Sequence, residues 1–202
     1  MKELDIKRLL VQKLAQEGST NALASEFPFD FGRRRADLIS IADDKLSGYE
    51  IKSYFDKLTN LAVQLKSYIS VFDYVYVVCD ERHLSKVREI APSKVGIYIA
   101  HDRSLVLKRK AKINNRLNKL VMLDVMPSPF LKQCFKLSAK SKFELCQKIS
   151  AVSKEKEIRR VLLHYINLRY ATQTKLFHND TSDLVTLDDV FSLFSAPPRN
   201  LE

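Results

Sequence analysis

The sequence predicts an α/β protein: a mixed four- or five-stranded sheet flanked by helices, followed by a small helical C-terminal unit. Two observations support this class. Apolar residues recur at helical spacing near the start, and short β-branched or aromatic runs then alternate with helical segments up to about residue 105. Beyond that point the strand signals fade. We therefore expect an α/β core over 1–105, a basic connector over 106–126 and a basic, mainly helical unit over 127–202.

The elements of the core follow from local patterns. Residues 3–16 fit an amphipathic helix, and residues 35–42 and 48–53 are predicted to be the strands of a hairpin with its turn at 43–45. The other expected elements are an extended stretch at 26–31, helices at 59–71 and 81–91, and strands at 73–78 and 95–100. This order is typical of a mixed sheet with helices packed on it.

The second half reads as helices. Pro127, Ser128 and Pro129 form a break, after which helical spacing is visible at 130–137, 140–150, 154–171 and 186–194. We expect these segments to form the C-terminal unit.

Basic charge is concentrated in this second half. The 202 residues carry a formal net charge of +10. Residues 1–105 hold 16 basic and 15 acidic side chains, whereas residues 106–202 hold 18 and 9. An excess of this kind favours a polyanionic partner, nucleic acid first and an anionic membrane surface second, although a merely soluble basic surface explains it equally well.

No membrane or secretion signal is evident. The sequence has no apolar run near the roughly 20 residues that a membrane-spanning helix needs. The first segment mixes charges with Leu and Val, unlike a secretion signal. We therefore expect a cytoplasmic protein with no membrane partner.

Acidic and basic side chains of the hairpin form the main candidate site. Glu50 and Lys52 project from the same face of their strand, because strand side chains alternate. A hairpin register that places Asp37 beside Glu50 brings two carboxylates together, and a hard cation would relieve their repulsion. All-oxygen ligation favours Mg²⁺ or Mn²⁺, with the backbone carbonyl of Ile51 and the carboxylate of Glu26 as further ligands.

Such a site has the parts needed to hydrolyse a phosphodiester bond. A bound Mg²⁺ lowers the pKa of a coordinated water, and Lys52 would orient that water and offset charge in the transition state. Gln64 and Tyr68 are four residues apart, so they share one face of the following helix and can donate hydrogen bonds to a phosphate or to the carboxylates. The alternative is a solvated hairpin whose charges form weak surface ion pairs, with Tyr68 simply flanking the core.

These residues carry a family resemblance over about residues 1–105. Asp37, twelve further residues and Glu50-x-Lys52 resemble the PD-(D/E)XK nuclease superfamily, and Gln64-x-x-x-Tyr68 is similar to a helix motif of its RecB-type branch. The run from 48 to 78 looks closer to a group of short, poorly characterised bacterial members. In that group an acid precedes a Gly-x-x-Arg-x-Asp-like segment, as Glu26 precedes Gly32, Arg35 and Asp37 here.

The resemblance implies a restriction-endonuclease-like core and a Mg²⁺-dependent nuclease acting on DNA. It implies that Asp37 and Glu50 are metal ligands and that Lys52 is the catalytic lysine. Glu26 matches the first acidic position, although Glu3 and Glu17 also lie near the first helix. The context implied is DNA repair, mobile elements or anti-phage systems.

Two other function classes stay open. One is a catalytically inactive nuclease-fold protein that binds nucleic acid or acts as a scaffold. The other is a basic module that uses residues 106–202 to grip a protein or a membrane. A homodimer and a protein partner are both compatible with the sequence.

Several basic residues are candidates for phosphate contact. Arginine suits bidentate contact with phosphate, which singles out Arg33 and Arg35 beside the ligand strand, and an exposed turn with solvated charges is the equal alternative. A second group forms a basic stripe, for which a solvated helix or edge-strand face is the alternative: Lys108, Arg109, Lys110, Lys112 and Arg116.

Overall fold

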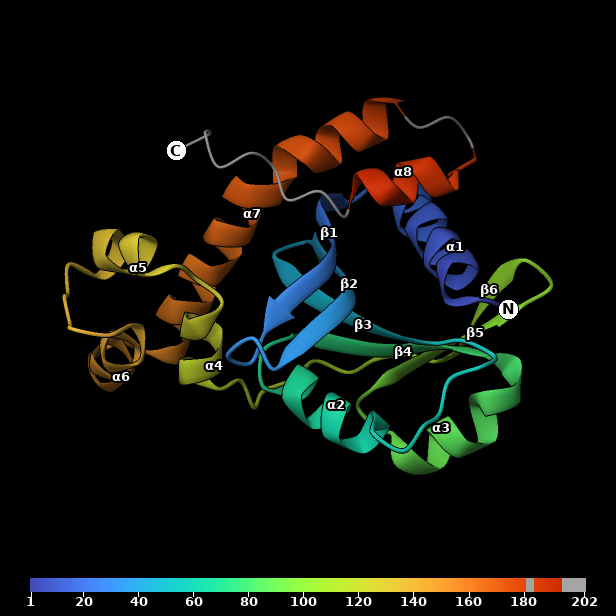
Figure 1. Ribbon diagram of the computed structural model, residues 1–202, viewed down its shortest axis with the longest axis horizontal. Helices are drawn as coiled ribbons and strands as arrows, with labels where there is room; N and C mark the ends of the chain where they lie inside the picture. Colours follow the sequence, from blue (N-terminus) through green and yellow to red (C-terminus); the bar gives the residue numbers. More distant parts are fainter. Residues whose placement is uncertain (181–183, 194–202) are drawn as a thin grey trace.

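A computed structural model describes residues 1–180 and 184–193, and Figure 1 shows an open sheet with helices on both faces. The six strands lie across the sheet in chain order. β3, β4 and β5 run parallel, and the other neighbours are antiparallel. The strands are β1 Thr20–Phe29, β2 Arg34–Ala42, β3 Lys45–Lys52, β4 Tyr74–Asp80, β5 Gly96–His101 and β6 Ser104–Arg109. The predicted α/β class is confirmed, but with six strands instead of four or five.

The extra strand is β6, which the sequence analysis missed. β6 is exposed along most of its length, so it lacks the clear apolar alternation that identifies a half-buried strand. It is joined to β5 through Asp102 and Arg103, both at positive φ, as in two-residue hairpin turns. Asp43 and Asp44, between β2 and β3, also have positive φ, and both lie within the predicted turn.

The described helices agree with the predicted order, with differences at their ends. α4 was not predicted, and α7 runs nine residues beyond the predicted end at residue 171, to Asp180. The helices are α1 Glu3–Gln16, α2 Leu61–Ile69, η1 Glu81–His83 (a short 3-10 helix), α3 Leu84–Ile90, α4 Lys119–Asp124, α5 Ser128–Phe135, α6 Lys142–Val152, α7 Glu155–Asp180 and α8 Leu187–Ser192. Among the residues described, no helix is both long and apolar enough to cross a membrane.

α1 and α8 cover one face of the sheet, and α2 and α3 cover the other (Figure 1). On the α1 side, Leu10 and Leu14 pack with Leu38 and Ile51 of the central strands. On the α2 side, the ring of Phe72 lies so close to β3 that a Cβ on Gly48 would sit 2.6 Å from it. Glycine at this position therefore lets α2 and the segment after it approach β3, two residues before Glu50.

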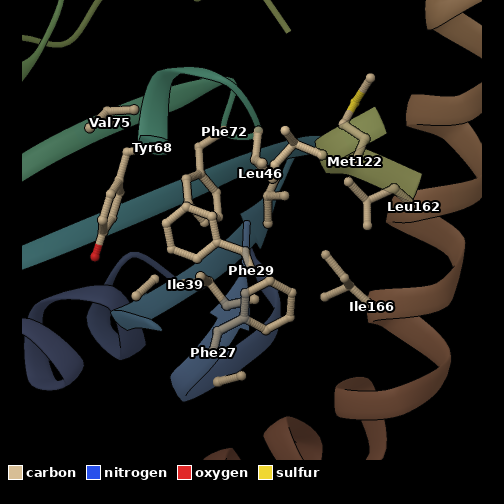
Figure 2. Close-up of a cluster of buried hydrophobic side chains, with 14 of the residues drawn as sticks. Phe27, Phe29, Ile39, Leu46, Tyr68, Phe72, Val75, Met122, Leu162 and Ile166 are labelled. Carbon is tan, nitrogen blue, oxygen red and sulfur yellow. The ribbon is translucent and has the colours of Figure 1, made fainter. Parts of the chain in front are cut away.

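The helical second half shares its core with the sheet. Figure 2 shows Leu162 and Ile166 of α7 directed toward the aromatic side chains of β1, with Met122 of α4 beside them. All three belong to the buried cluster that also contains Phe27 and Phe29. The residues predicted as core (1–105) and as C-terminal unit (127–202) thus contribute to one hydrophobic cluster.

α7 and the segment after α8 also cover the outer edge of β1. The Thr174 hydroxyl accepts the Leu23 amide at 2.7 Å, and the Leu193 carbonyl accepts the Ser25 amide at 3.3 Å. These contacts satisfy backbone groups that an edge strand otherwise leaves open.

Candidate active site

The register of the β2–β3 hairpin brings Asp37 next to Glu50. Leu38 pairs with Tyr49, so the next step of the ladder sets Asp37 opposite Glu50, as predicted. There the Asp37 carboxylate accepts the backbone amide of Ile51 at 2.6 Å. The side chain of Asp37 is therefore held against β3 by a backbone group that is fixed by the sheet.

Glu50 is the most enclosed acid of the group. Its side chain is on the α2 side of β3 and the residue is only 2% exposed. One oxygen, Oε1, accepts Lys52 Nζ at 2.7 Å and Gln64 Nε2 at 2.5 Å. The structure thus joins three of the predicted residues through one carboxylate, and places Lys52, 9% exposed, on the same face as Glu50.

The surroundings of Asp37 disfavour its ionised form. Burial, followed by the charge of Glu50, raises the pKa of Asp37 to about 8, while the Ile51 amide and the Lys7 ammonium lower it. Two carboxylates that share a low-dielectric site favour protonation of one of them. Carboxylate oxygens are ligands that Mg²⁺ and Mn²⁺ prefer, so these acids could hold such an ion. Among the described residues, the acids with carboxylate oxygens within 4.8 Å of one another are Glu3, Glu26 and Asp37, and Glu50 is not in that group.

Glu26 lies on the other side of Asp37. The β1–β2 pairs Ser25–Leu38 and Phe27–Ala36 set Glu26 opposite Asp37. Glu26 has a φ of 54°, a left-handed conformation that is uncommon outside glycine. Its carboxylate accepts Lys7 Nζ of α1 at 2.6 Å.

This left-handed residue changes which side chains of β1 face the core. Before Glu26 the even-numbered Ala22 and Ala24 belong to the α2-side cluster, and after it the odd-numbered Phe27 and Phe29 do. The pairing register with β2 is unchanged across Glu26, so the positive φ turns the strand over without adding a residue. It directs Glu26 to a group in which carboxylate oxygens of Glu3, Glu26 and Asp37 lie within 4.8 Å of one another.

Tyr68 is mainly a core residue. It is buried, and its ring packs edge-on against Phe29, with centroids 5.1 Å apart. Its hydroxyl donates to the Tyr49 carbonyl at 3.3 Å. Burial and then the charges of Glu50 and Asp37 raise its pKa well above the ordinary value. Tyr68 therefore stays neutral beside the acids, and its ring packs in the core. Packing against the core is the alternative role that the sequence left open for this residue.

The side chain and the backbone amide of Ile51 have different partners. Its side chain packs on the α1 side while its amide serves Asp37. The use of its carbonyl as a metal ligand stays a prediction.

The two predicted arginines near the site have different surroundings. Arg33 is tied to its own turn, donating to the Asp30 carboxylate at 2.7 Å. Arg35 is exposed, and its guanidinium lies 3.9 Å from the Glu26 carboxylate. Of the two, Arg35 is thus the one beside the acids.

The predicted basic stripe is not brought to these acids. Arg109 donates to the backbone carbonyls of Ala91, Pro92 and Val95, so its guanidinium stabilises the loop between α3 and β5. The segment after it pairs with the backbone before β4, where the Asn114 amide donates to the Asp73 carbonyl. That is the amino end of β4, whereas Glu50 and Lys52 lie at the carboxyl end of the parallel β3. Lys108, Lys110, Lys112 and Arg116 are exposed on these segments.

Comparison with known proteins assigns the family. A model of the family described as bacteriophage P4 protein cII matches residues 1–193. The chain belongs to this family. Protein cII of Enterobacteria phage P4 is 34% identical to it over 138 residues, covering 65% of this chain and 52% of that protein. The match thus spans about half the length of this cII relative.

A solved structure is also similar. It is a protein of unknown function from Silicibacter pomeroyi, 18% identical, matching 58% of this chain and 77% of that one with a TM-score of 0.43.

The sequence analysis of this cII-family chain did not assign Lys7 to the site. Lys7 is only 1% exposed, and its ammonium lies 3.7 Å from Glu3 as well as 2.6 Å from Glu26. A signal was present: Glu3 and Lys7 occupy the same helical stripe as Leu10 and Leu14. A charge at an inward position of an amphipathic helix, here Lys7, needs a polar partner on the other side.

Proposed function

We propose that the chain is a divergent PD-(D/E)XK-type nuclease that uses Mg²⁺ or Mn²⁺ to hydrolyse phosphodiester bonds in DNA. The observation that carries the proposal is the pairing of Asp37 with Glu50 across the hairpin, with Lys52 bound to Glu50. The high pKa of Asp37 supports a cation site, because burial first, and the charge of Glu50 second, disfavour its ionised form, which a bound cation would stabilise.

Each residue has a distinct task in this proposal. Asp37 and Glu50 hold the cation, with Glu26 or Glu3 as a third oxygen donor. When bound, the cation lowers the pKa of a coordinated water and offsets charge on the phosphate. Gln64 fixes the orientation of Glu50 from α2. Lys52 places its ammonium beside Glu50, where it orients the attacking water and stabilises the negative charge of the transition state.

The similar cII protein comes from a phage. Of the contexts that the sequence resemblance implies, this favours a mobile-element role.

Cleavage assays test the proposal. Supercoiled DNA, linear DNA and RNA are incubated with Mg²⁺, Mn²⁺ or EDTA. We expect metal-dependent cleavage of DNA that Lys52→Ala lowers by about 10²- to 10⁴-fold, because a charge-stabilising group is lost. Lys66→Ala is the matched control, since Lys66 is an exposed lysine of the neighbouring helix α2. Equal cleavage by the wild type and Lys52→Ala would overturn the assignment.

One observation favours a second function, a nuclease-fold protein that binds nucleic acid without cutting it. Glu50 is already compensated by Lys52 and Gln64, so this carboxylate is satisfied without an ion. Calorimetric titration with Mn²⁺ separates the two functions. Heat of binding that disappears in Asp37→Asn supports the nuclease, and DNA binding with neither Mn²⁺ heat nor cleavage supports the second function.

A further inference from the structure

Two exposed aromatic side chains follow directly after the proposed catalytic lysine. Tyr54 is 45% exposed and Phe55 is 75% exposed. Consecutive Cα atoms are about 3.8 Å apart, so the Cα atoms of Tyr54 and Lys52 are at most about 8 Å apart. Adjacent large apolar side chains that stay in water form a contiguous patch, and such patches can mark a surface for a ligand.

The loop that carries these rings is held on several sides. Asp56 accepts both the amide and the hydroxyl of Ser53, at 2.6 and 2.5 Å. The Ser53 carbonyl is 2.9 Å from His83 Nε2, and the Tyr54 amide donates to the Met1 carbonyl at 3.0 Å. The backbone is therefore fixed before any ligand arrives, which lowers the entropy cost of binding.

The rings of Tyr54 and Phe55 contact each other, and the guanidinium of Arg82 lies over one of them. Tyr54 and Phe55 meet edge to face, with centroids 5.2 Å apart and an interplanar angle of 77°. The guanidinium of Arg82 lies 4.1 Å from the centre of the Tyr54 ring, within cation–π range. Lys57 follows in the same loop and is exposed. In the described part of the chain, neither Arg82 nor Lys57 forms an ion pair with a carboxylate.

Rings with adjacent cations match one ligand chemistry closely. An unstacked base offers a π-face to an aromatic side chain, and its phosphate pairs with arginine or lysine. Bases in an intact duplex already stack on one another, so they cannot offer their faces to Phe55. An unpaired strand fits the platform, and a regular double helix does not.

We propose that Tyr54, Phe55 and Arg82 form a stacking platform that holds unpaired nucleotides of a DNA strand next to Lys52. The proposal rests on the nuclease function above and narrows its substrate to single-stranded DNA or to duplexes with unpaired ends. The platform seats a base on the exposed ring of Phe55, and Arg82 and Lys57 receive the neighbouring phosphates.

Binding is measured without cleavage, so that it is read independently of catalysis. The anisotropy of a dye-labelled 20-nucleotide strand and of the matching duplex is followed in EDTA. We expect Phe55→Ala to weaken binding of the single strand by about 5- to 150-fold, the usual loss when one stacked base loses its aromatic partner. Duplex binding should change less than twofold.

Two variants control for other causes. Phe143→Ala removes another exposed ring, 51% exposed, from α6 and should leave both affinities unchanged. Phe55→Trp keeps a stacking surface and should retain single-strand binding. An oligonucleotide with abasic sites should bind the wild type as weakly as it binds Phe55→Ala, because it offers no bases to stack.

The outcomes distinguish this proposal from the one on which it rests. Unchanged single-strand binding by Phe55→Ala overturns the platform, whatever the cleavage assay gives. Weaker single-strand binding by Phe55→Ala, together with equal cleavage by wild type and Lys52→Ala, overturns the nuclease and keeps the platform. A dimer that Phe55→Ala converts to a monomer, with single-strand binding unchanged, assigns the rings to contact between copies and overturns the platform.

Discussion

Asp73 and Asp37 are both enclosed carboxylates of the sheet region, but their surroundings differ. Asp73, just before β4, binds Arg159 of α7 through both oxygens, at 2.7 and 2.6 Å, and also accepts the Leu46 amide at 2.8 Å. Asp37 receives one backbone amide and faces a second acid, Glu50. The first carboxylate is satisfied within the protein. The second has no ion pair of its own among the described residues and faces a like charge, an arrangement that a bound cation would relieve.

Asp37→Asn gives the largest expected effect on activity. The amide oxygen of Asn can still accept the Ile51 amide, but the charge that would hold the metal is gone. We expect cleavage to fall by about 10³-fold or more, while the melting temperature of the metal-free protein at pH 8 stays equal or rises. Initial rates and thermal denaturation measure the two effects. A variant that still cleaves at the wild-type rate would place the metal elsewhere.

Arg159→Ala should lower stability and leave cleavage unchanged, the reverse of Asp37→Asn. It leaves Asp73 as a buried charge without its partner, which costs about 3–5 kcal/mol of unfolding free energy. Urea denaturation measures the loss, and cleavage per folded molecule should not change. The neighbouring Arg160 is exposed, so Arg160→Ala should stay within about 0.5 kcal/mol of the wild type. Equal stability of the two variants would contradict a structural role for the Asp73–Arg159 pair.

The smallest expected effect is the contribution of Asp37 to the pH dependence of the free energy of unfolding. The pKa of Asp37 is about 8 in the folded chain, against an ordinary value of 3.8. Between these values the unfolded state has released the proton and the folded state keeps it, so the free energy of unfolding falls as pH rises from about 4 to about 8.

We expect Asp37 to contribute about 2 kcal/mol to this decline without metal. Urea denaturation at pH 5 and pH 8 measures it, with Asp37→Asn as the reference that cancels other titrating groups. Identical slopes for wild type and variant would show that Asp37 is ionised throughout.

Local patterns in the sequence were enough to predict the hairpin and its charges. The alternation along β3 placed Glu50 and Lys52 on one face. The register that brings Asp37 to Glu50 was assumed in the prediction, and the structure fixes it by a two-residue turn, Asp43 and Asp44, one residue shorter than the predicted turn. Both are short-range consequences of strand geometry. The order of the elements up to residue 101 followed in the same way.

Long-range contacts were beyond the reach of these patterns. Lys7 reaches Glu26 from another element, and the left-handed backbone of Glu26 has no sequence signal of the kind that glycine provides. β6 was missed because an exposed edge strand need not alternate. The basic stripe was predicted from charge alone, and charge does not say that Arg109 would bind backbone carbonyls.

The two edges of the sheet set a limit on how copies of the chain can associate. The outer edge of β1 is partly covered, because Thr174 and Leu193 accept the amides of Leu23 and Ser25, whereas β6 is exposed along most of its length. Pairing of strands between copies therefore has one free edge for each molecule. Two such edges can join and close the assembly as a pair, but a molecule with a single free edge cannot add copies on both sides. In the described part of the chain, pairing through β6 would therefore join two copies as a closed pair and would not continue into a filament.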